Sequence, residues 1–231
     1  MTFLFDVDGV ICDRGEKIDP EFKLWLTNFL KDKKFHWVTG SMREKTIHQI
    51  GQDLYDMCDL SFHSMGNEIY VHGEEVLINQ FNLTSEEKDF LLTCVNESLF
   101  TQKIGPHIEQ RKGSVNFSIP GRNADKNVRQ QYIEYDKINS ERLKLVEKIE
   151  NNMPRFQAYI GGDISIDICL KNCNKGQVVF LSGSKALFFG DRMDKFGIDV
   201  PLMHMCSDSH HIKNGYKETW EILKTYDINS A

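Results

Sequence analysis

Hydrophobic and polar residues alternate in blocks along the first third of the chain. Between short apolar runs lie longer stretches whose apolar residues recur at roughly helical spacing, as Phe22, Trp25 and Leu30 do. The pattern predicts strands at Thr2–Phe5, Phe35–Val38 and Leu60–Phe62, helices at Pro20–Lys31 and Arg43–Gly51, and a hairpin of Glu68–Tyr70 with Val76–Ile78. This alternation of strands and helices is typical of an α/β unit with a parallel sheet.

The middle of the chain has a different pattern, in which strands and helices are grouped. A helix is expected at Ser85–Leu99, where the TSEE sequence from Thr84 to Glu87 matches a capping box. The other expected elements are a half-exposed strand at Ser114–Ile119, a helical region at Asn127–Ile149 broken near Lys137–Ser140, and strands at Phe156–Ile160 and Ile164–Leu170. Such grouping favours a separate α+β module.

The α/β pattern returns after this module. The elements expected there are a helix near Lys175–Leu181, strands at Ala186–Phe189 and Leu202–Met205, and a final helix from Tyr216. We therefore predict an α/β fold with one interrupted core domain. Residues 1–80 form the first part of the core, residues 81–173 form an inserted module, and residues 174–231 form the second part of the core.

Composition narrows the functional classes. The 231 residues carry a formal net charge of −6, which argues against nonspecific nucleic-acid binding. No apolar run approaches the length that crosses a membrane, so we expect no membrane partner. Six cysteines are scattered through the chain, unlike the dense cysteines of small secreted scaffolds, and this favours reduced thiols. We expect a soluble, cytoplasmic protein.

Two aspartates end the first predicted strand. In TFLFDVDGV, Asp6 and Asp8 follow the apolar run, and Gly9 permits a sharp turn. Ligands of open parallel sheets bind beyond the carboxyl ends of the strands. A carboxylate there can attack phosphorus, and a second one two residues on points the same way and can act as an acid or a base. The motif alone is equally consistent with a polar turn.

Polar residues after the later strands strengthen the catalytic interpretation. FHWVTGS places Thr39 and Ser41 after the second strand, Lys175 opens the helix after the module, and FFGD ends a strand at Asp191, with Asp199 downstream. Phosphoryl transfer uses such hydroxyls, a cation, and acids that hold Mg²⁺. This order of residues resembles the haloacid dehalogenase superfamily of phosphotransferases. The resemblance implies a Rossmann-like core with an inserted α+β cap domain.

The inserted module carries a cluster of arginines. Arg111, Arg122 and Arg129 lie within RKGSVNFSIPGRNADKNVR, and a guanidinium matches the geometry of a phosphate. In GGDISID, Ser165 and Asp167 alternate on one face of a predicted strand and are spaced to bind sugar hydroxyls. Composition alone favours a solvated, charged surface here.

Both segments resemble the eukaryotic-type phosphomannomutase family. RKGSVNFSIPGRNADKNVR resembles the family's cap segment and GGDISIDICLKNCNK its next motif, and DVDG and FFGD also match. The resemblance implies that Asp6 is the nucleophile and Asp8 the general acid and base, with Lys175 as the third member of the catalytic set. The expected substrate-binding residues are Thr39, Ser41, Arg111, Asn116, Arg122, Arg129, Ser165 and Asp167. The expected Mg²⁺ ligands are Asp6, Asp8, Asp191 and Asp199.

The resemblance implies a Mg²⁺-dependent mutase that interconverts mannose 1-phosphate and mannose 6-phosphate, and a homodimer through the cap is a further expectation. The sequence departs from the family pattern at Val10, where threonine is usual, and in the loop RMDKFGI after Asp191, which lacks a Gly-Gly-Asn run. A sugar-phosphate phosphatase of the same fold therefore stays open as an alternative. A silent sugar-phosphate sensor is disfavoured because both aspartates are present.

Two further features carry less weight. Arg14 lies one residue away from the position that the family pattern suggests, so it is not assigned as a phosphate contact. Cys206, Asp208, His210 and His211 match no familiar zinc spacing, and a polar loop is expected there.

Overall fold

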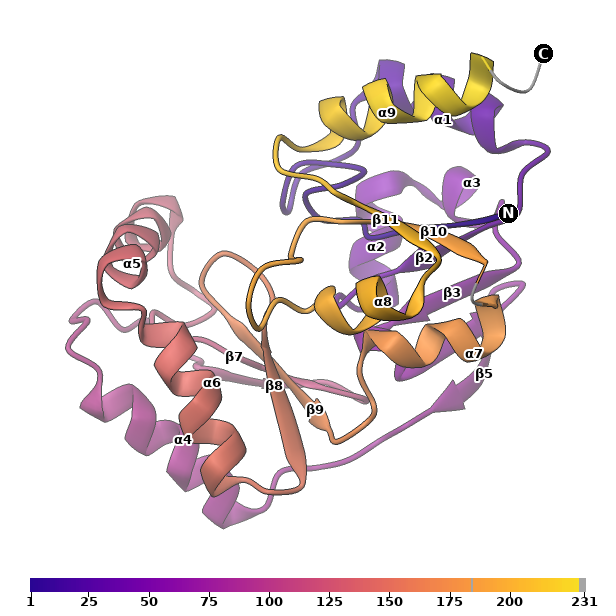
Figure 1. Cartoon of the computed structure of the whole chain (residues 1–231). Helices are drawn as coiled ribbons and strands as arrows, with labels where there is room; N and C mark the ends of the chain where they lie inside the picture. Colours follow the sequence, from indigo (N-terminus) through magenta and orange to yellow (C-terminus); the bar gives the residue numbers. More distant parts are fainter. Residues whose placement is uncertain (184, 229–231) are drawn as a thin grey trace.

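A computed structural model describes residues 1–183 and 185–228, and these residues form two sheets that are separately covered by helices (Figure 1). The larger sheet has the strand order β11 (Asp208–His211), β10 (Ala186–Gly190), β1 (Thr2–Phe5), β2 (Phe35–Val38), β3 (Leu60–His63), β4 (Glu68–Val71) and β5 (Glu74–Ile78). From β11 to β3 neighbouring strands are parallel, and β4 and β5 add an antiparallel edge. A short 3-10 turn, η1 (Ser64–Gly66), joins β3 to β4.

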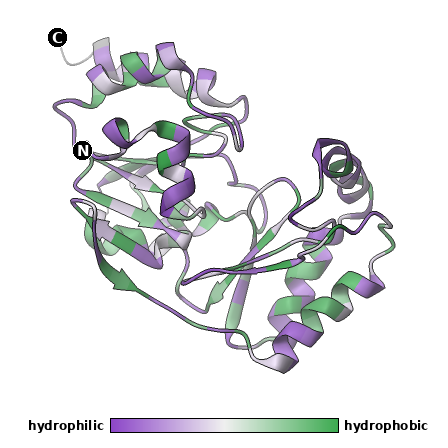
Figure 2. Cartoon of the chain, turned by 180° about the vertical axis from the view of Figure 1, so that it is seen from behind, coloured by the Kyte–Doolittle hydropathy of each residue, from purple (hydrophilic) through white to green (hydrophobic). Residues whose placement is uncertain are grey.

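Alternating side chains of β1 face two hydrophobic layers. Phe3 and Phe5 pack in the cluster formed with α1 (Pro20–Leu30), α2 (Arg43–Ile50), α3 (Gln52–Tyr55) and α9 (Tyr216–Ile228). Leu4 packs on the opposite face, with η2 (Lys175–Val178), α7 (Val179–Ser182) and α8 (Val200–Met205). Hydrophobic residues accordingly run through the strands in Figure 2. A sheet covered on both faces is the arrangement expected of parallel α/β folds.

The smaller sheet is antiparallel and has the strand order β6 (Ile108–Gln110), β7 (Val115–Phe117), β9 (Ile166–Leu170) and β8 (Phe156–Ile160). Its outer face packs against α4 (Ser85–Glu97), α5 (Lys126–Asn139) and α6 (Glu141–Asn152), which lie on the side away from the larger sheet (Figure 1). We call this sheet and its three helices the cap. The larger sheet and its helices are called the core.

Several local signals in the sequence are confirmed. Thr84 and Glu87 form the capping box at the start of α4. The helical region breaks at Ser140, which has a left-handed φ of 52° between α5 and α6. The strands and helices predicted for the first 80 residues are also found, with boundaries that differ by at most two residues, and one short helix, α3, was not predicted.

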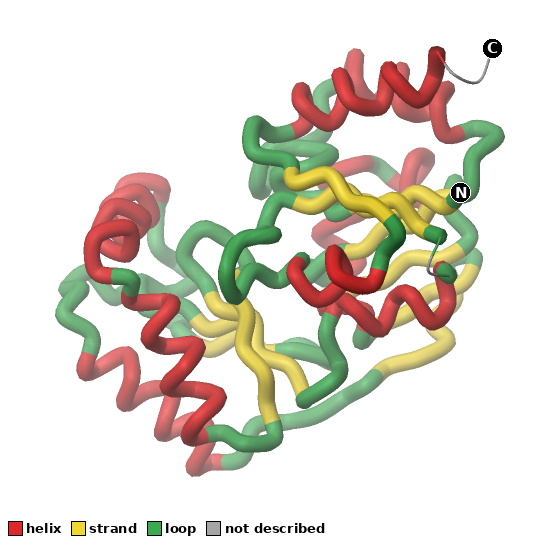
Figure 3. The backbone as a smooth tube through the Cα atoms, in the orientation of Figure 1, coloured by secondary structure: helices red, strands yellow, loops and turns green. Residues whose placement is uncertain are grey.

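Two expectations about the second half are wrong. Leu202–Met205 is not a strand: Val200–Met205 forms α8 (Figure 3), with Pro201 in its first turn and Leu202 buried against the core. A short apolar run does not distinguish a buried helix from a strand. The next strand is instead the polar β11, in the segment expected to be a loop. It lies at the edge of the sheet, where polar side chains face water.

The strand expected at Ser114–Ile119 is shorter and more buried than its alternation suggested. Only Val115–Phe117 pair as β7, yet all six residues are buried. Two of its polar residues have partners or surroundings inside the protein: Asn116 lines the site described below, and Ser118 Oγ donates to the carbonyl oxygen of Ile164 at 3.1 Å.

No helix in the described part of the chain is long and apolar enough to cross a bilayer. All six cysteines are unpaired, and four of them are buried.

Candidate active site

The residues that follow β1, β2 and β10 meet at one edge of the core sheet. Both β10 and β2 pair in parallel with β1, so the chain leaves all three strands at the same carboxyl edge. Asp6, Thr39 and Asp191 consequently line one pocket between the core and the cap.

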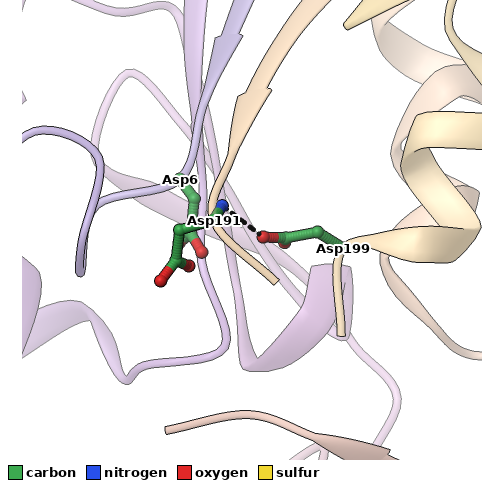
Figure 4. Close-up of side chains that lie close together, drawn as sticks. All are labelled: Asp6, Asp191 and Asp199. Atoms are coloured by element: carbon green, nitrogen blue, oxygen red, sulfur yellow. Dashed lines mark hydrogen bonds between the residues drawn. The ribbon is translucent and has the colours of Figure 1, made fainter. Parts of the chain in front are cut away.

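Three aspartates gather on the core side of this pocket. Asp6, Asp191 and Asp199 each place a carboxylate oxygen within 4.8 Å of the others (Figure 4). The turn after β1 makes this approach possible, because Gly9 has a φ of +82° and a Cβ there would collide with the carboxylate of Asp191. Glycine adopts this conformation without the steric cost that other residues pay.

Lys175 joins two of these aspartates from beneath the pocket. Its side chain is fully buried, and its Nζ lies 3.0 Å from Asp6 Oδ2 and 2.6 Å from Asp199 Oδ1. The second oxygen of Asp199 accepts hydrogen bonds from the backbone N–H groups of Asp191 and Arg192, each at 3.0 Å. Asp199 therefore fixes both the lysine and the loop after β10.

The buried position of Asp6 changes its acidity. Burial raises its pKa to about 6, with Asp199 adding to the rise and Lys175 opposing it. Burial also favours the neutral form of Lys175, but Asp199 and Asp6 outweigh it and raise the pKa of the ammonium. The site thus keeps a cation beside a carboxylate that burial alone would neutralise.

The acid cluster has the donor set for a hard divalent cation. Mg²⁺ prefers carboxylate oxygens and retains several waters or phosphate oxygens. Oδ1 of Asp191 is buried and has no hydrogen-bond partner among the described residues. Oδ2 of Asp191 forms an ion pair with Arg14, which already supplies positive charge there. Asp6 and Asp191 line the pocket and therefore fit a Mg²⁺ ion, whereas Asp199 lies behind the lining with both oxygens engaged by protein donors.

Asp8 points to a different set of partners. Oδ1 accepts from the backbone N–H of Gly15 and from Gln49 Nε2, each at 2.9 Å. Oδ2 accepts from Ser41 Oγ at 3.1 Å and forms an ion pair with Lys45. Burial alone would raise the pKa of Asp8, but Lys45 and these hydrogen bonds outweigh it and lower the pKa to about 2. Asp8 is thus ionised and lies in the pocket, outside the cluster of three aspartates.

The cap contributes a row of polar side chains to the opposite wall. Strand register places Glu109 of β6 opposite Asn116 of β7, and Asn116 opposite Asp167 of β9. The alternate residues Val115 and Phe117 enter the apolar layer under the cap helices. Because side chains alternate along a strand, Glu109, Asn116 and Asp167 share the face turned toward the core. Asn116 Nδ2 donates to Asp167 Oδ1 at 2.8 Å.

Two arginines extend this wall. Arg111 Nη2 donates to Glu109 Oε2 at 2.9 Å, and Arg122 Nε lies 3.0 Å from the same oxygen. Arg111 Nη1 also donates to the carbonyl oxygen of Gly40 in the core at 3.0 Å. Arg111 therefore bridges the cap and the core directly across the pocket.

The turn between β8 and β9 closes one end of the wall. Gly161, Gly162 and Ser165 line the pocket. A Cβ on Gly161 would collide with the carboxylate of Asp167, so the absence of a side chain lets this turn approach the polar row. This close packing accounts for the glycine at position 161.

Most of the residues predicted from the sequence are brought together in the pocket, and three lie outside its lining. The lining includes Asp6, Asp8, Thr39, Ser41, Arg111, Asn116, Arg122, Ser165, Asp167 and Asp191. Lys175 and Asp199 lie buried behind it. Arg129 is turned away: its Nε donates to the carbonyl oxygen of Ala124 at 2.8 Å, and its Nη2 to that of Arg122 at 3.0 Å.

Four further charged residues line the pocket: Lys45, Glu109 and Arg192, which the sequence pattern did not indicate, and Arg14, which was considered and left unassigned. Arg14 and Arg192 both pair with Asp163 of the cap, at 3.3 Å and 2.5 Å. Glu109 lies two residues before Arg111, but the sequence pattern predicts no strand there, so it gave no signal that the two side chains share a face. Lys45 lies on α2 and is one of several similar charges there.

Solved structures with the same arrangement identify the fold class. The chain matches the IMP-nucleotidase of Plasmodium falciparum with a TM-score of 0.65 at 15% identity, over 98% of this chain and 68% of the other. It matches a trehalose-6-phosphate phosphatase related protein with a TM-score of 0.58 at 17% identity, over 100% and 98% of the two chains. Sucrose-phosphatase from Synechocystis sp. PCC6803 gives 0.57 at 18% identity, over 98% and 87%. These likenesses show the fold, a haloacid dehalogenase core with an inserted α+β cap.

Sequence comparison identifies the family within this class. The family described as eukaryotic phosphomannomutase matches residues 23–226. The phosphomannomutase of Saccharomyces cerevisiae is 32% identical over 86% of this chain and 83% of its own length. That of Babesia bovis is 29% identical, over 93% of both chains. The protein belongs to the eukaryotic phosphomannomutase family of enzymes.

Proposed function

We propose that this protein is a hexose-phosphate mutase that interconverts mannose 1-phosphate and mannose 6-phosphate. The observation that carries the proposal is the opposition of two groups across one pocket. The carboxylates of Asp6 and Asp8 face it from the core, and Arg111 and Arg122 face it from the cap. A mutase needs both sides, because one phosphate of its bisphosphorylated intermediate reacts while the other is held.

Asp6 is the proposed nucleophile. Its carboxylate attacks a phosphoryl group of hexose bisphosphate, the P–O bond to the sugar breaks, and the phosphoryl group remains on Asp6. Lys175, which lies 3.0 Å from Asp6, orients the carboxylate and balances its charge. Thr39, which follows β2, is placed to donate to phosphate oxygens from the core wall, and Ser41 lines the same wall with its hydroxyl donated to Asp8.

Asp8 is the proposed general base and acid. It is ionised in this structure, the form that accepts a proton from a sugar hydroxyl as that hydroxyl attacks phosphorylated Asp6. In the reverse direction it returns the proton to the leaving oxygen. Ser41 and Lys45 hold the carboxylate of Asp8 in position during both transfers.

Asp6 and Asp191 are the proposed direct ligands of Mg²⁺, with Asp199 orienting the loop that carries Asp191. The ion would neutralise charge on the phosphoryl group during transfer. The carboxylate of Asp8 is committed to protein donors, so we propose that residue 8 would approach the ion through its main chain.

The cap is the proposed distal phosphate clamp and water barrier. In this proposal residues 1–80 and 174–231 form the core domain and residues 81–173 form the cap domain. Arg111 and Arg122 hold the unreactive phosphate, and Asn116, Ser165 and Asp167 hold sugar hydroxyls. Arg129 supports the loop that carries Arg122 through its bond to the Arg122 carbonyl. Covering the site protects phosphorylated Asp6 from hydrolysis.

The proposed setting is a cytoplasmic homodimer that is joined through the cap. Leu92, Leu99 and Ile138 are exposed on the cap, with exposed fractions of 43%, 82% and 82%. Apolar side chains in such positions suit contact with a second copy. Sedimentation in solution tests this assembly: a monomer at micromolar concentration would refute it.

A sugar-phosphate phosphatase is the second candidate. It is favoured by the loop after Asp191, where Ile198 lines the pocket in place of a polar residue of the Gly-Gly-Asn pattern. An apolar side chain there alters the surroundings in which a water molecule or a sugar hydroxyl approaches phosphorylated Asp6.

One parallel assay separates the two candidates. Mannose 1-phosphate is supplied with a catalytic amount of hexose 1,6-bisphosphate and Mg²⁺, and mannose 6-phosphate and inorganic phosphate are measured together. The proposal predicts that mannose 6-phosphate forms faster than inorganic phosphate is released. Stoichiometric release of phosphate without the 6-phosphate would refute the mutase and establish the phosphatase.

A further inference from the structure

Arg111 and Arg122, which form the proposed distal phosphate clamp, already pair with a carboxylate of the protein itself. A single carboxylate oxygen, Glu109 Oε2, lies 2.9 Å from Arg111 Nη2 and 3.0 Å from Arg122 Nε. Glu109 lines the pocket beside both arginines, and its side chain is 29% exposed. Its carboxylate therefore occupies donors that an incoming phosphate would use.

A second acid adds to this internal pairing. Asp167 Oδ1 lies 3.5 Å from Arg111 Nη1, so two carboxylates face two guanidinium groups on the cap wall. The clamp is thus close to neutral before a ligand arrives. Arg111 Nε is buried without a hydrogen-bond partner among the described residues.

Glu109 remains charged at neutral pH. Burial alone would raise its pKa, but Arg111 and Arg122 together outweigh burial, and Lys45 across the pocket adds to their effect. The pKa of Glu109 consequently lies below its usual range. A carboxylate at this position therefore repels a bound phosphate while it attracts the arginines that bind it.

We propose that Glu109 is a positioning residue that moderates the distal phosphate clamp. Without a ligand, Glu109 orients the guanidinium groups of Arg111 and Arg122. With a ligand bound, its negative charge lowers the affinity of these arginines for the phosphate. The kinetic part of this inference rests on the proposed mutase function. The bisphosphate must leave the clamp, turn, and return with its other phosphate, and a clamp that binds too tightly slows that step.

The direct test is phosphate binding by Glu109→Gln, which keeps the shape of the side chain and removes its charge. Wild type and variant are titrated calorimetrically with inorganic phosphate, with a chelator present so that no metal draws phosphate to the acid cluster. We expect the variant to bind about fivefold more tightly or better, given the strength of charge-assisted contacts. Glu75→Gln is the matched control, because Glu75 pairs with Lys112 of the cap at 2.8 Å outside the pocket.

A second pair of variants shows whether the effect acts through the clamp. Introducing Glu109→Gln into Arg122→Ala should produce a clearly smaller gain in affinity than in wild type, because one partner of the carboxylate is absent. Unchanged or weaker phosphate binding by Glu109→Gln would overturn the proposal and leave Glu109 as a scaffold for the arginines. An equal gain with and without Arg122 would overturn it as well.

Kinetics then separate this inference from the proposed function. In a mutase, Glu109→Gln should lower both KM for mannose 1-phosphate and kcat, whereas Glu75→Gln should change neither. If wild type only releases phosphate, the proposed mutase function is refuted. The moderating role of Glu109 is then still tested by the calorimetric result alone. A lower affinity for phosphate together with a higher KM refutes the moderating role whatever the reaction is.

Discussion

The ammonium group of Lys175 lies 3.0 Å from the carboxylate of Asp6, and both side chains are buried. Asp199 stands on the other side of the same ammonium at 2.6 Å. One cation thus sits between two acids from opposite ends of the chain and joins the end of β1 to the loop after β10. The catalytic strand and the metal-side loop depend on this contact for their relative position.

Lys175→Met should therefore destabilise the fold strongly. It leaves Asp6 and Asp199 buried without their cation, a loss that is typically about 3 to 5 kcal/mol when one partner of a buried pair is removed. Lys23→Met is the control, because Lys23 pairs with the exposed Asp53 and such surface pairs contribute about 0 to 1 kcal/mol. Urea unfolding of both variants measures the difference. Equal losses of unfolding free energy in the two variants would show that the buried ion pairs of Lys175 stabilise the fold no more than an exposed pair does.

Removing divalent metal should abolish turnover without unfolding the protein. Asp6 and Asp191 converge on one point of the pocket, and Oδ1 of Asp191 has no protein donor among the described residues. Exhaustive chelation followed by an activity assay and a circular dichroism spectrum tests this. Mg²⁺ should restore the rate, and Asp191→Asn should need a higher Mg²⁺ concentration for half-maximal activity. Full activity in chelator would exclude the metal.

Arg122→Ala should damage the natural reaction more than the simplest one. The arginine is placed to hold the phosphate that does not react, and a charge-assisted contact contributes about 1.5 to 3 kcal/mol, so kcat/KM for mannose 1-phosphate should fall about tenfold or more. Hydrolysis of a small aryl phosphate at Asp6 does not need the clamp and should be largely spared. Arg129→Ala should give the same selectivity in weaker form, because it acts through the Arg122 loop. Equal damage to both substrates would place these arginines in the core site or the fold.

Much of the core half of this site followed from local sequence patterns. Short apolar runs that end in charges or hydroxyls located Asp6, Thr39 and Asp191, because parallel strands bring their carboxyl ends to one edge. The polar strand β11 escaped prediction for the opposite reason. At an edge, hydrogen bonds to β10 hold the strand, so its residues need not be apolar.

The residues of the cap side of the site could not be predicted in the same way, because their positions depend on the pairing register of β6, β7 and β9, which the sequence alone does not determine. Glu109 looked like an ordinary surface charge until the β6–β7–β9 pairing placed it beside Asn116 and Asp167. Arg129 matched the family pattern by position, yet its guanidinium is used by two backbone carbonyl groups. Such choices among partners are decided by tertiary packing rather than by spacing.

Stability should fall as the pH is lowered, partly through His36. This histidine is fully buried on β2, and burial lowers its pKa from 6.5 to about 4. Between these values the unfolded chain binds a proton that the folded chain does not, so the free energy of unfolding decreases by up to about 1.4 kcal/mol per pH unit. His36→Leu should lose this contribution, and the exposed His72→Leu should not. Urea unfolding at about pH 7 and about pH 5 gives the change in the free energy of unfolding for each protein. The same change in wild type and in His36→Leu would show that His36 does not cause the pH dependence.

The most direct test of the account is the location of the phosphoryl group on the enzyme. Wild type is mixed with hexose 1,6-bisphosphate and Mg²⁺, quenched in acid during turnover, digested, and mapped by mass spectrometry. We predict one phosphoryl group on Asp6 and none on Asp6→Asn, whose turnover should fall by about a thousandfold or more. The exposed Asp32→Asn serves as the control and should keep both the phosphoryl group and the rate. A phosphoryl group on another residue, or full turnover by Asp6→Asn, would contradict the account.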